Sequence, residues 1–130
     1  MAQGLLAAAL PEARVESAGL GALVGEPADP LARELMQRRG ITIDRHRARQ
    51  ISTELCQRAD LVLVMDAEQR RTIEERYVFA AGKVFRLCEF SDRDVPDPYR
   101  AGRASFERAL TLIEDGTQQW VKRISRVASR

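Results

Sequence analysis

Short uninterrupted apolar runs alternate with longer amphipathic segments along the chain. The clearest run, residues 61–65 (LVLVM), lies between Asp60 and Asp66. A β-branched-rich run of this length is typical of a strand buried on both faces, as in a parallel sheet. Residues 83–87 form the next strand candidate, and residues 14–17 form a further short one. We therefore expect a parallel sheet whose strands are separated by helices.

The strongest helical periodicity begins at about Arg103. Apolar side chains recur there at steps of four and three, which predicts one long helix with a single apolar stripe facing a core. The stripe consists of Phe106, Leu110, Ile113, Trp120, Ile124 and Val127, with Thr117 filling one step. Gly116 weakens this helix but need not end it.

Capping signals mark two helices in the first part of the chain. The Ala- and Leu-rich residues 1–10 predict a short helix that Pro11 ends. Asp29 can cap a helix that starts at Pro30, a favoured first position, and Gly40 is suited to terminate it. Both helices are shorter than the one predicted at the end of the chain.

Similar signals mark two more helices. Ser52 opens a short helix, and Asp66 with Gln69 three residues later resembles a capping box at the start of a charged helix. Residues 89–102 are polar and contain two prolines, so we expect a loop there. No repeat or linker divides the sequence. The prediction is therefore an α/β fold in a single domain over residues 1–130.

The composition favours a globular protein and excludes several classes of partner. The 130 residues are 45% hydrophobic and 31% charged, and the formal net charge is +2. Such a balanced charge gives no reason to expect a nucleic-acid or membrane partner. No apolar run is long enough to span a bilayer. Two cysteines suggest no disulfide framework, which favours a reducing, cytoplasmic location. The oligomeric state stays open.

The most informative polar segment is the loop at residues 95–99 (VPDPY). Open α/β sheets bind ligands beyond the carboxyl ends of their strands, and residues 17–19, Asp66 and this loop all follow strand candidates. Prolines on both sides restrict the backbone around Asp97. A carboxyl held in a stiff loop beside the Tyr99 ring fits a general acid. Taken alone, the segment fits a solvated turn better, because Asp and Pro are ordinary turn residues.

Neither cysteine fits a phosphatase nucleophile. Phosphatases of that kind cradle phosphate in a loop where Arg follows Cys by six positions. The residue six positions after Cys56 is Val62, and the residue six positions after Cys88 is Asp94. We therefore expect both cysteines to be small packing residues.

The remaining polar groups predict no second kind of site. His46 is the only histidine, and a local hydrogen bond suits it better than a role as a base. The basic residues Arg45, Arg47 and Arg49 fit a solvated loop better than a phosphate site. Since no metal-ligand spacing is present, we expect neither a metal nor another cofactor.

Six segments, taken together and in order, resemble the bacterial low-molecular-weight protein tyrosine phosphatases. They are residues 1–6 (MAQGLL), 17–19 (SAG), 27–30 (PADP), 46–50 (HRARQ), 59–65 (ADLVLVM) and 96–99 (PDPY). The resemblance implies a three-layer fold in which helices flank a four-stranded parallel sheet. It also implies metal-free hydrolysis of phosphotyrosine through a cysteinyl-phosphate intermediate. The implied partner is a phosphotyrosine protein; bacterial relatives often act on tyrosine kinases of polysaccharide export.

The resemblance assigns roles to two residues of this sequence. Asp97 is implied to be the general acid that donates a proton to the leaving phenol, and Tyr99 is implied to form a wall of the substrate cleft. Phenol has a high pKa, so its departure benefits from a proton donor. The Tyr99 ring would offer an aromatic face to the substrate ring.

The nucleophile loop of that family (Cys, five residues, Arg, then Ser or Thr) has no counterpart in this sequence. In the family it follows the first strand and precedes a segment that resembles residues 1–6 here. We therefore expect an N-terminally truncated member that lacks the first, central strand and the nucleophile loop. Such a chain should not turn over substrate. It should also fold poorly, because the inner edges of its sheet lack backbone partners.

Three alternatives stay open. The chain fits a non-catalytic remnant that binds phosphoproteins or serves as an interaction module. Thiol-dependent arsenate reductases share the fold, but their chemistry needs redox cysteines close together after the third strand, where only Cys88 is found. Protein arginine phosphatases also resemble this family, and Tyr99 after Pro98 favours the tyrosine-directed branch.

Overall fold

The computed structural model describes residues 1–21 and 23–128. Its elements are α1 (Ala2–Ala9), α2 (Pro30–Gln37), α3 (Thr53–Arg58), β1 (Val62–Val64), α4 (Ala67–Arg76), η1 (Val78–Ala80), β2 (Val84–Arg86), η2 (Glu89–Ser91) and α5 (Arg103–Ala128), where η denotes a 3-10 helix. The predicted helices and the strands at residues 61–65 and 83–87 are confirmed, with shorter bounds.

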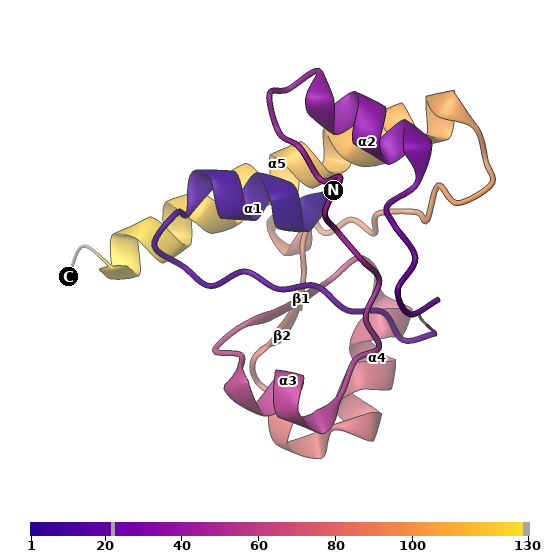
Figure 1. Ribbon diagram of the computed structural model, residues 1–130. Helices are drawn as coiled ribbons and strands as arrows, with labels where there is room; N and C mark the ends of the chain where they lie inside the picture. Colours follow the sequence, from indigo (N-terminus) through magenta and orange to yellow (C-terminus); the bar gives the residue numbers. More distant parts are fainter. Residues whose placement is uncertain (22, 129–130) are drawn as a thin grey trace.

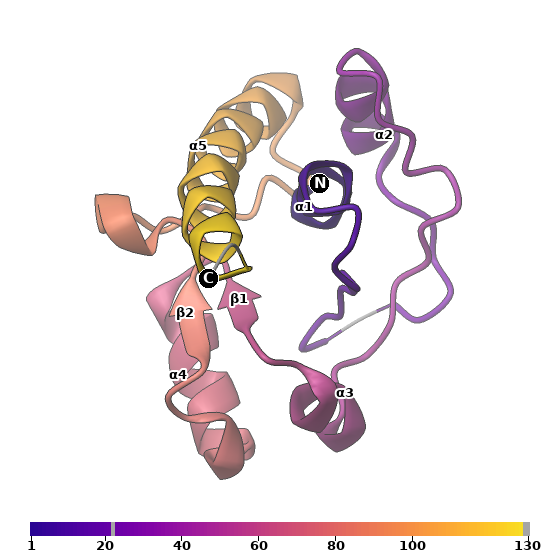
Figure 2. The same ribbon diagram turned by 90° about the vertical axis from the view of Figure 1, so that its left-hand side faces the viewer.

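A small parallel sheet lies between two groups of helices. β1 pairs with β2 in the register Val62↔Val84, Leu63↔Phe85 and Val64↔Arg86. The long α5 runs beside α1 and packs against α2 on one side of the sheet, and α3 and α4 lie on the other side (Figure 1). Turned by 90°, the view shows α1 between α5 and α2 (Figure 2). The predicted α/β class with a three-layer, parallel-sheet architecture is confirmed.

The unbroken apolar run of β1 reflects burial on both faces of the sheet. Leu63 and Met65 pack into a core cluster with α5, whereas Val62 and Val64 pack into a cluster with α4 and η1. Because successive side chains of a strand point to opposite faces, both faces of this strand need apolar residues.

The apolar stripe of α5 is also confirmed over most of its length. Its first residues, Phe106 and Leu110, pack against α2, and Ile113 and Trp120 pack against the sheet. Leu110 is completely buried, and burial of such a side chain is worth about 1.5–3 kcal/mol. The side chain of Val127, which the sequence placed on the same stripe, lies outside the described residues.

The three predicted N-caps all form their hydrogen bonds. The carboxylate of Asp29 accepts from the Leu31 N–H at 2.8 Å, and the hydroxyl of Ser52 accepts from the Leu55 N–H at 3.2 Å. Asp66 accepts from the Gln69 N–H at 2.7 Å and so caps α4. The Gln69 carboxamide oxygen accepts from the N–H of Met65, one residue before the position that a capping box uses.

The predicted strand at residues 14–17 is wrong. A strand needs a ladder of backbone partners, and the Val15 carbonyl instead accepts a hydrogen bond from the side-chain amide of Gln3 at 3.2 Å. The nearest residue with a bridge of the sheet type is Gly19, which forms an isolated parallel bridge with Gln50. Within residues 1–21 and 23–128, β2 is the one strand paired with β1. The described sheet therefore has two strands, where a family sheet of four without its first strand would have three.

Candidate active site

The loop between η2 and α5 is attached to the carboxyl end of β1. The Val95 N–H donates to the Met65 carbonyl at 2.8 Å, and the Val95 side chain is buried in the core beside α5. The next residues, Pro96 to Pro98, emerge from this anchor. The predicted position of the loop, beyond the end of a parallel strand, is therefore confirmed.

Asp97 lies on the exposed side of this loop. One of its carboxylate oxygens accepts a hydrogen bond from the Tyr99 N–H at 2.9 Å, an arrangement that fixes the side chain against its own backbone. Asp97 contributes to the wall of a cavity of about 340 Å³ at the start of α5. The other lining residues are Pro96, Pro98, Ala101, Ser105, Arg108, Ala109 and Leu112.

Tyr99 does not line that cavity. Its side chain is 53% exposed, and the guanidinium of Arg100 lies over the ring at 5.0 Å from the centroid. Arg100 adopts a positive φ of 61°, which turns the chain toward α5. The ring is thus an exposed aromatic surface two residues from Asp97.

A second cavity, of about 240 Å³, lies at the turn that follows the Val15 segment. It is lined by Ser17, Ala18, Gly19, His46, Ala48 and Arg49. The Ser17 hydroxyl donates to the carboxamide oxygen of Gln3 at 2.7 Å, and the His46 Nδ1 lies 3.3 Å from the same oxygen. Three segments of the family resemblance, residues 1–6, 17–19 and 46–50, therefore meet at one place through Gln3.

The environment of His46 favours the neutral form of its imidazole. Burial lowers the pKa of His46, and the positive charges of the Met1 ammonium, Arg47 and Arg49 lower it further. The predicted hydrogen bond exists, but its partner is Gln3, distant in sequence, rather than a local group. Arg49 donates to the Ser17 carbonyl at 3.3 Å, so this arginine holds the turn rather than standing free.

Both cysteines are packing residues, as predicted. Cys56 and Cys88 are free thiols with exposures of 1% and 2%. Burial raises the pKa of each thiol, which disfavours the nucleophilic thiolate. The Cys88 thiol donates to the Leu112 carbonyl at 3.2 Å, inside the contact between η2 and α5.

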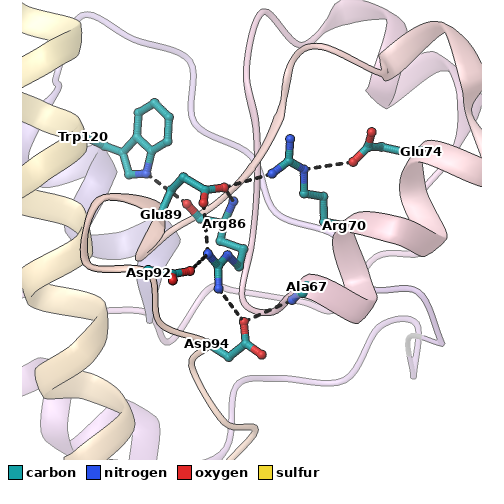
Figure 3. A network of polar contacts seen from close by, with 8 residues as sticks. All are labelled: Ala67, Arg70, Glu74, Arg86, Glu89, Asp92, Asp94 and Trp120. Atoms are coloured by element: carbon teal, nitrogen blue, oxygen red, sulfur yellow. Dashed lines mark hydrogen bonds and ion pairs between the residues drawn. The ribbon is translucent and has the colours of Figure 1, made fainter.

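Sequence reasoning missed one group next to the Asp97 loop. Arg86 of β2 contacts Glu89, Asp92 and Asp94 (Figure 3). The signal was present as an arginine inside an apolar strand, followed within eight residues by three acidic residues. Asp66, which the sequence offered as a candidate beyond β1, is occupied as the cap of α4.

Neither a metal-binding cluster nor a helix suited to crossing a membrane is found in the described ranges. Among residues 1–21 and 23–128, no three His, Cys, Asp or Glu side chains are grouped so that they could hold a metal ion. In the same part of the chain, no helix combines the length and apolarity needed to cross a membrane.

The comparison with protein families decides the classification. The family described as "Low molecular weight phosphotyrosine protein phosphatase" matches residues 1–130. The chain belongs to this family.

Individual relatives agree with that assignment. The chain is 50% identical to the "Probable low molecular weight protein-tyrosine-phosphatase EpsP" of Ralstonia nicotianae, over 95% of this chain and 86% of the relative. It is 38% identical to the phosphatase Wzb of Escherichia coli, over 95% of this chain and 85% of the relative. The solved structure of Vibrio vulnificus Wzb in complex with benzylphosphonate is 31% identical and superposes with a TM-score of 0.90. That match covers 94% of this chain and 87% of the other.

Proposed function

We propose that this protein is a protein tyrosine phosphatase in which Asp97 protonates the leaving phenol. The observation that carries the proposal is the attachment of the Asp97 loop to the carboxyl end of β1, in a chain that matches the family over residues 1–130. The names of the relatives, which are tyrosine phosphatases, support the same reaction. We propose that residues 1–130 form a single domain of this family's type.

The proposed reaction uses two loops, one that carries a cysteine nucleophile and one that carries Asp97. A cysteine thiolate attacks phosphorus, and the bond from phosphorus to the phenolic oxygen breaks. Asp97 gives its proton to that oxygen, since a phenolate is a poor leaving group without one. The exposed Tyr99 ring offers a face to the aromatic ring of the substrate. Water then attacks the phosphorus of the cysteinyl phosphate and gives a proton to the Asp97 carboxylate, while the bond from phosphorus to sulfur breaks, which returns the thiolate and releases phosphate.

The nucleophile has no candidate among residues 1–130. Neither Cys56 nor Cys88 is followed by arginine at the sixth position, and both thiols are buried. We propose that residues 1–130 do not turn over substrate unless a loop of the form Cys, five residues, Arg is joined to them. We define the upstream-extended chain as residues 1–130 preceded by a strand and a loop of this form.

The proposed substrate is a phosphotyrosine protein in the cytoplasm. A tyrosine kinase of a polysaccharide-export system is the specific partner that we propose, on the strength of the family resemblance. The two free, buried cysteines agree with a reducing compartment.

A second candidate is a phosphoprotein-binding module without catalysis. It is favoured by the buried state of both cysteines together with the exposed ring of Tyr99. Binding of a phosphotyrosine peptide to residues 1–130, without hydrolysis and weakened by Tyr99→Ala, would support this candidate.

The proposed function is tested by substrate selectivity in the upstream-extended chain. Matched peptides carrying phosphotyrosine or phosphoserine are offered, and release of phosphate is measured. We expect turnover of the phosphotyrosine peptide alone, and a raised KM in Tyr99→Ala. Equal hydrolysis of both peptides, or none of either, would contradict the proposal.

A further inference from the structure

Arg86 is the centre of an ion-pair network beside the Asp97 loop (Figure 3). Its side chain is only 14% exposed. The guanidinium donates to Glu89 at 3.0 Å, to Asp94 at 3.1 Å and to Asp92. Hydrogen bonds to Asp92, Glu89 and Asp94 raise the pKa of Arg86, so the charge is permanent.

Further contacts fix the position of Arg86. It occupies the last position of β2, in register with Val64 of β1. Its carbonyl accepts from the indole N–H of Trp120 at 3.2 Å. Glu89 is held from a second side by Arg70 of α4 at 3.1 Å. The guanidinium is therefore presented from a rigid base, unlike a long side chain free in solvent.

Asp94 connects this arginine to a second element. The same carboxylate oxygen that accepts from Arg86 also accepts from the N–H of Ala67 at 3.2 Å. Ala67 is the first residue of α4, where free N–H groups and the helix dipole favour a negative charge. Asp94 is thus bound both by β2 and by the N-terminus of α4, although its side chain is 51% exposed.

The position of Asp94 determines where Asp97 can lie. The next residue, Val95, donates its N–H to Met65 at 2.8 Å. Only Pro96 separates Val95 from Asp97, and Pro98 follows. Prolines fix φ and restrict the preceding residue, so a shift at residues 94 and 95 would be passed on to the carboxyl group of Asp97.

We propose that Arg86 is a positioning residue for the proton donor, acting through Asp94 to hold the loop that carries Asp97 at the end of β1. This inference rests on the proposed function for its kinetic consequence, but not for its structural one. Loss of the Arg86–Asp94 contact removes one of the two elements that hold Asp94, which loosens the loop and lets the donor move away from the leaving oxygen. Neither Arg86 nor Asp94 is proposed to bind substrate, so KM should stay unchanged when their contact is lost.

The structural consequence is tested by amide hydrogen exchange in the upstream-extended chain. The informative amide is that of Val95. We expect Arg86→Gln and Asp94→Asn each to speed its exchange by about tenfold or more, because charge-assisted hydrogen bonds are lost. Arg39→Gln is the control, since Arg39 also pairs with a carboxylate of another element, Glu114 at 2.8 Å, and makes none of the contacts that hold this loop. Exchange of Leu110 in the core reports whether the fold survives.

The kinetic consequence is tested with aryl phosphates of graded leaving-group pKa. In Arg86→Gln, kcat should fall by about tenfold or more on phosphotyrosine and much less on a phosphate whose leaving group needs no proton. KM should stay unchanged in Arg86→Gln. Arg86→Lys should recover part of the lost kcat. The double variant Arg86→Gln with Asp94→Asn should have a kcat no lower than that of Arg86→Gln alone. This non-additivity is expected if Arg86 and Asp94 affect kcat through the same contact.

The outcomes separate the two proposals. Faster exchange at Val95 together with a kcat loss that grows with leaving-group pKa supports the positioning role. An unchanged Val95 exchange rate, or an equal kcat loss on every substrate, overturns it. If the upstream-extended chain shows no turnover, the proposed function fails, and Val95 exchange alone decides whether Arg86 holds the loop. If Arg86→Gln does not fold, the exposed Asp94→Asn decides instead.

Discussion

Gly116 of α5 lies directly against the backbone of Leu87. A Cβ placed on Gly116 would be 2.8 Å from the Leu87 carbonyl oxygen and 2.9 Å from the Cys88 sulfur. The glycine that weakens this helix by propensity is therefore the one that lets α5 approach the sheet. The helix continues through it from Arg103 to Ala128.

We expect Gly116→Ala to lower the free energy of unfolding. Overpacking costs about 1–3 kcal/mol, which outweighs the roughly 1 kcal/mol that alanine gains over glycine within a helix. Gly21→Ala is the control, because a Cβ there meets nothing within 4 Å. Urea unfolding of both variants in the upstream-extended chain measures the difference. A more stable Gly116→Ala would contradict the close approach.

Asp97→Asn tests the general acid in the upstream-extended chain. We expect kcat on phosphotyrosine to fall by about 10²–10⁴-fold, the range typical of general acid catalysis. The loss should shrink for aryl phosphates with acidic leaving groups, because these depart as anions. A loss of the same size across all leaving groups would assign Asp97 a structural role instead.

His46 should titrate below its ordinary pKa of about 6.5. Burial is the main cause, with the charges of Arg47 and Arg49 acting in the same direction. Because the unfolded state then binds more protons between the folded pKa and about 6.5, stability should fall as the pH drops through that window. His46→Gln should remove this pH dependence.

Proton NMR can follow His46 without assignment, since the sequence has one histidine. The upstream-extended chain is titrated folded and again in urea, where a pKa near 6.5 is expected. A folded-state pKa at or above the urea value would show that the contact with Gln3 stabilises the imidazolium.

A further expectation concerns the free edge of β1. Alternate backbone groups of this strand point away from β2, and within residues 1–21 and 23–128 no other strand pairs with them. Each backbone group buried without a partner costs about 1–3 kcal/mol, which is large against a total stability of about 5–15 kcal/mol. We expect residues 1–130 alone to melt broadly and the upstream-extended chain to melt cooperatively.

Near-UV circular dichroism is the measurement, with Trp120 as the probe of packing. Its indole is buried between Phe85 and Phe90, with ring centroids at 5.6 and 4.8 Å. A sharp, reversible transition of residues 1–130 at the same midpoint as the upstream-extended chain would refute this expectation.

Local signals explain which parts of the fold could be predicted. The N-caps at Asp29, Ser52 and Asp66 and the apolar run of β1 each depend on residues close together in the sequence. Residues 14–17 do not form the predicted strand because strand propensity is local, whereas strand formation requires a partner. Without an adjacent strand, the Val15 carbonyl bonds to the side chain of Gln3.

The candidate site likewise has a part that local sequence signals predict and a part that depends on contacts between distant residues. The loop around Asp97 was found because its prolines make a local pattern. The contact of Gln3 with Ser17 and His46 spans 14 and 43 residues, and no periodicity encodes it. Arg86 and Asp94 are only eight residues apart, but their contact depends on the turn through η2, which sequence reasoning had assigned to an irregular loop.

Our central proposal is that residues 1–130 hold the proton donor of a tyrosine phosphatase but not its nucleophile. Hydrolysis of p-nitrophenyl phosphate tests it most directly, with purified residues 1–130 and the upstream-extended chain measured side by side. We expect residues 1–130 to hydrolyse the substrate no faster than a buffer blank, and the upstream-extended chain to show vanadate-sensitive turnover. Vanadate-sensitive turnover by residues 1–130 that is lost on Cys56→Ser or Cys88→Ser would contradict it.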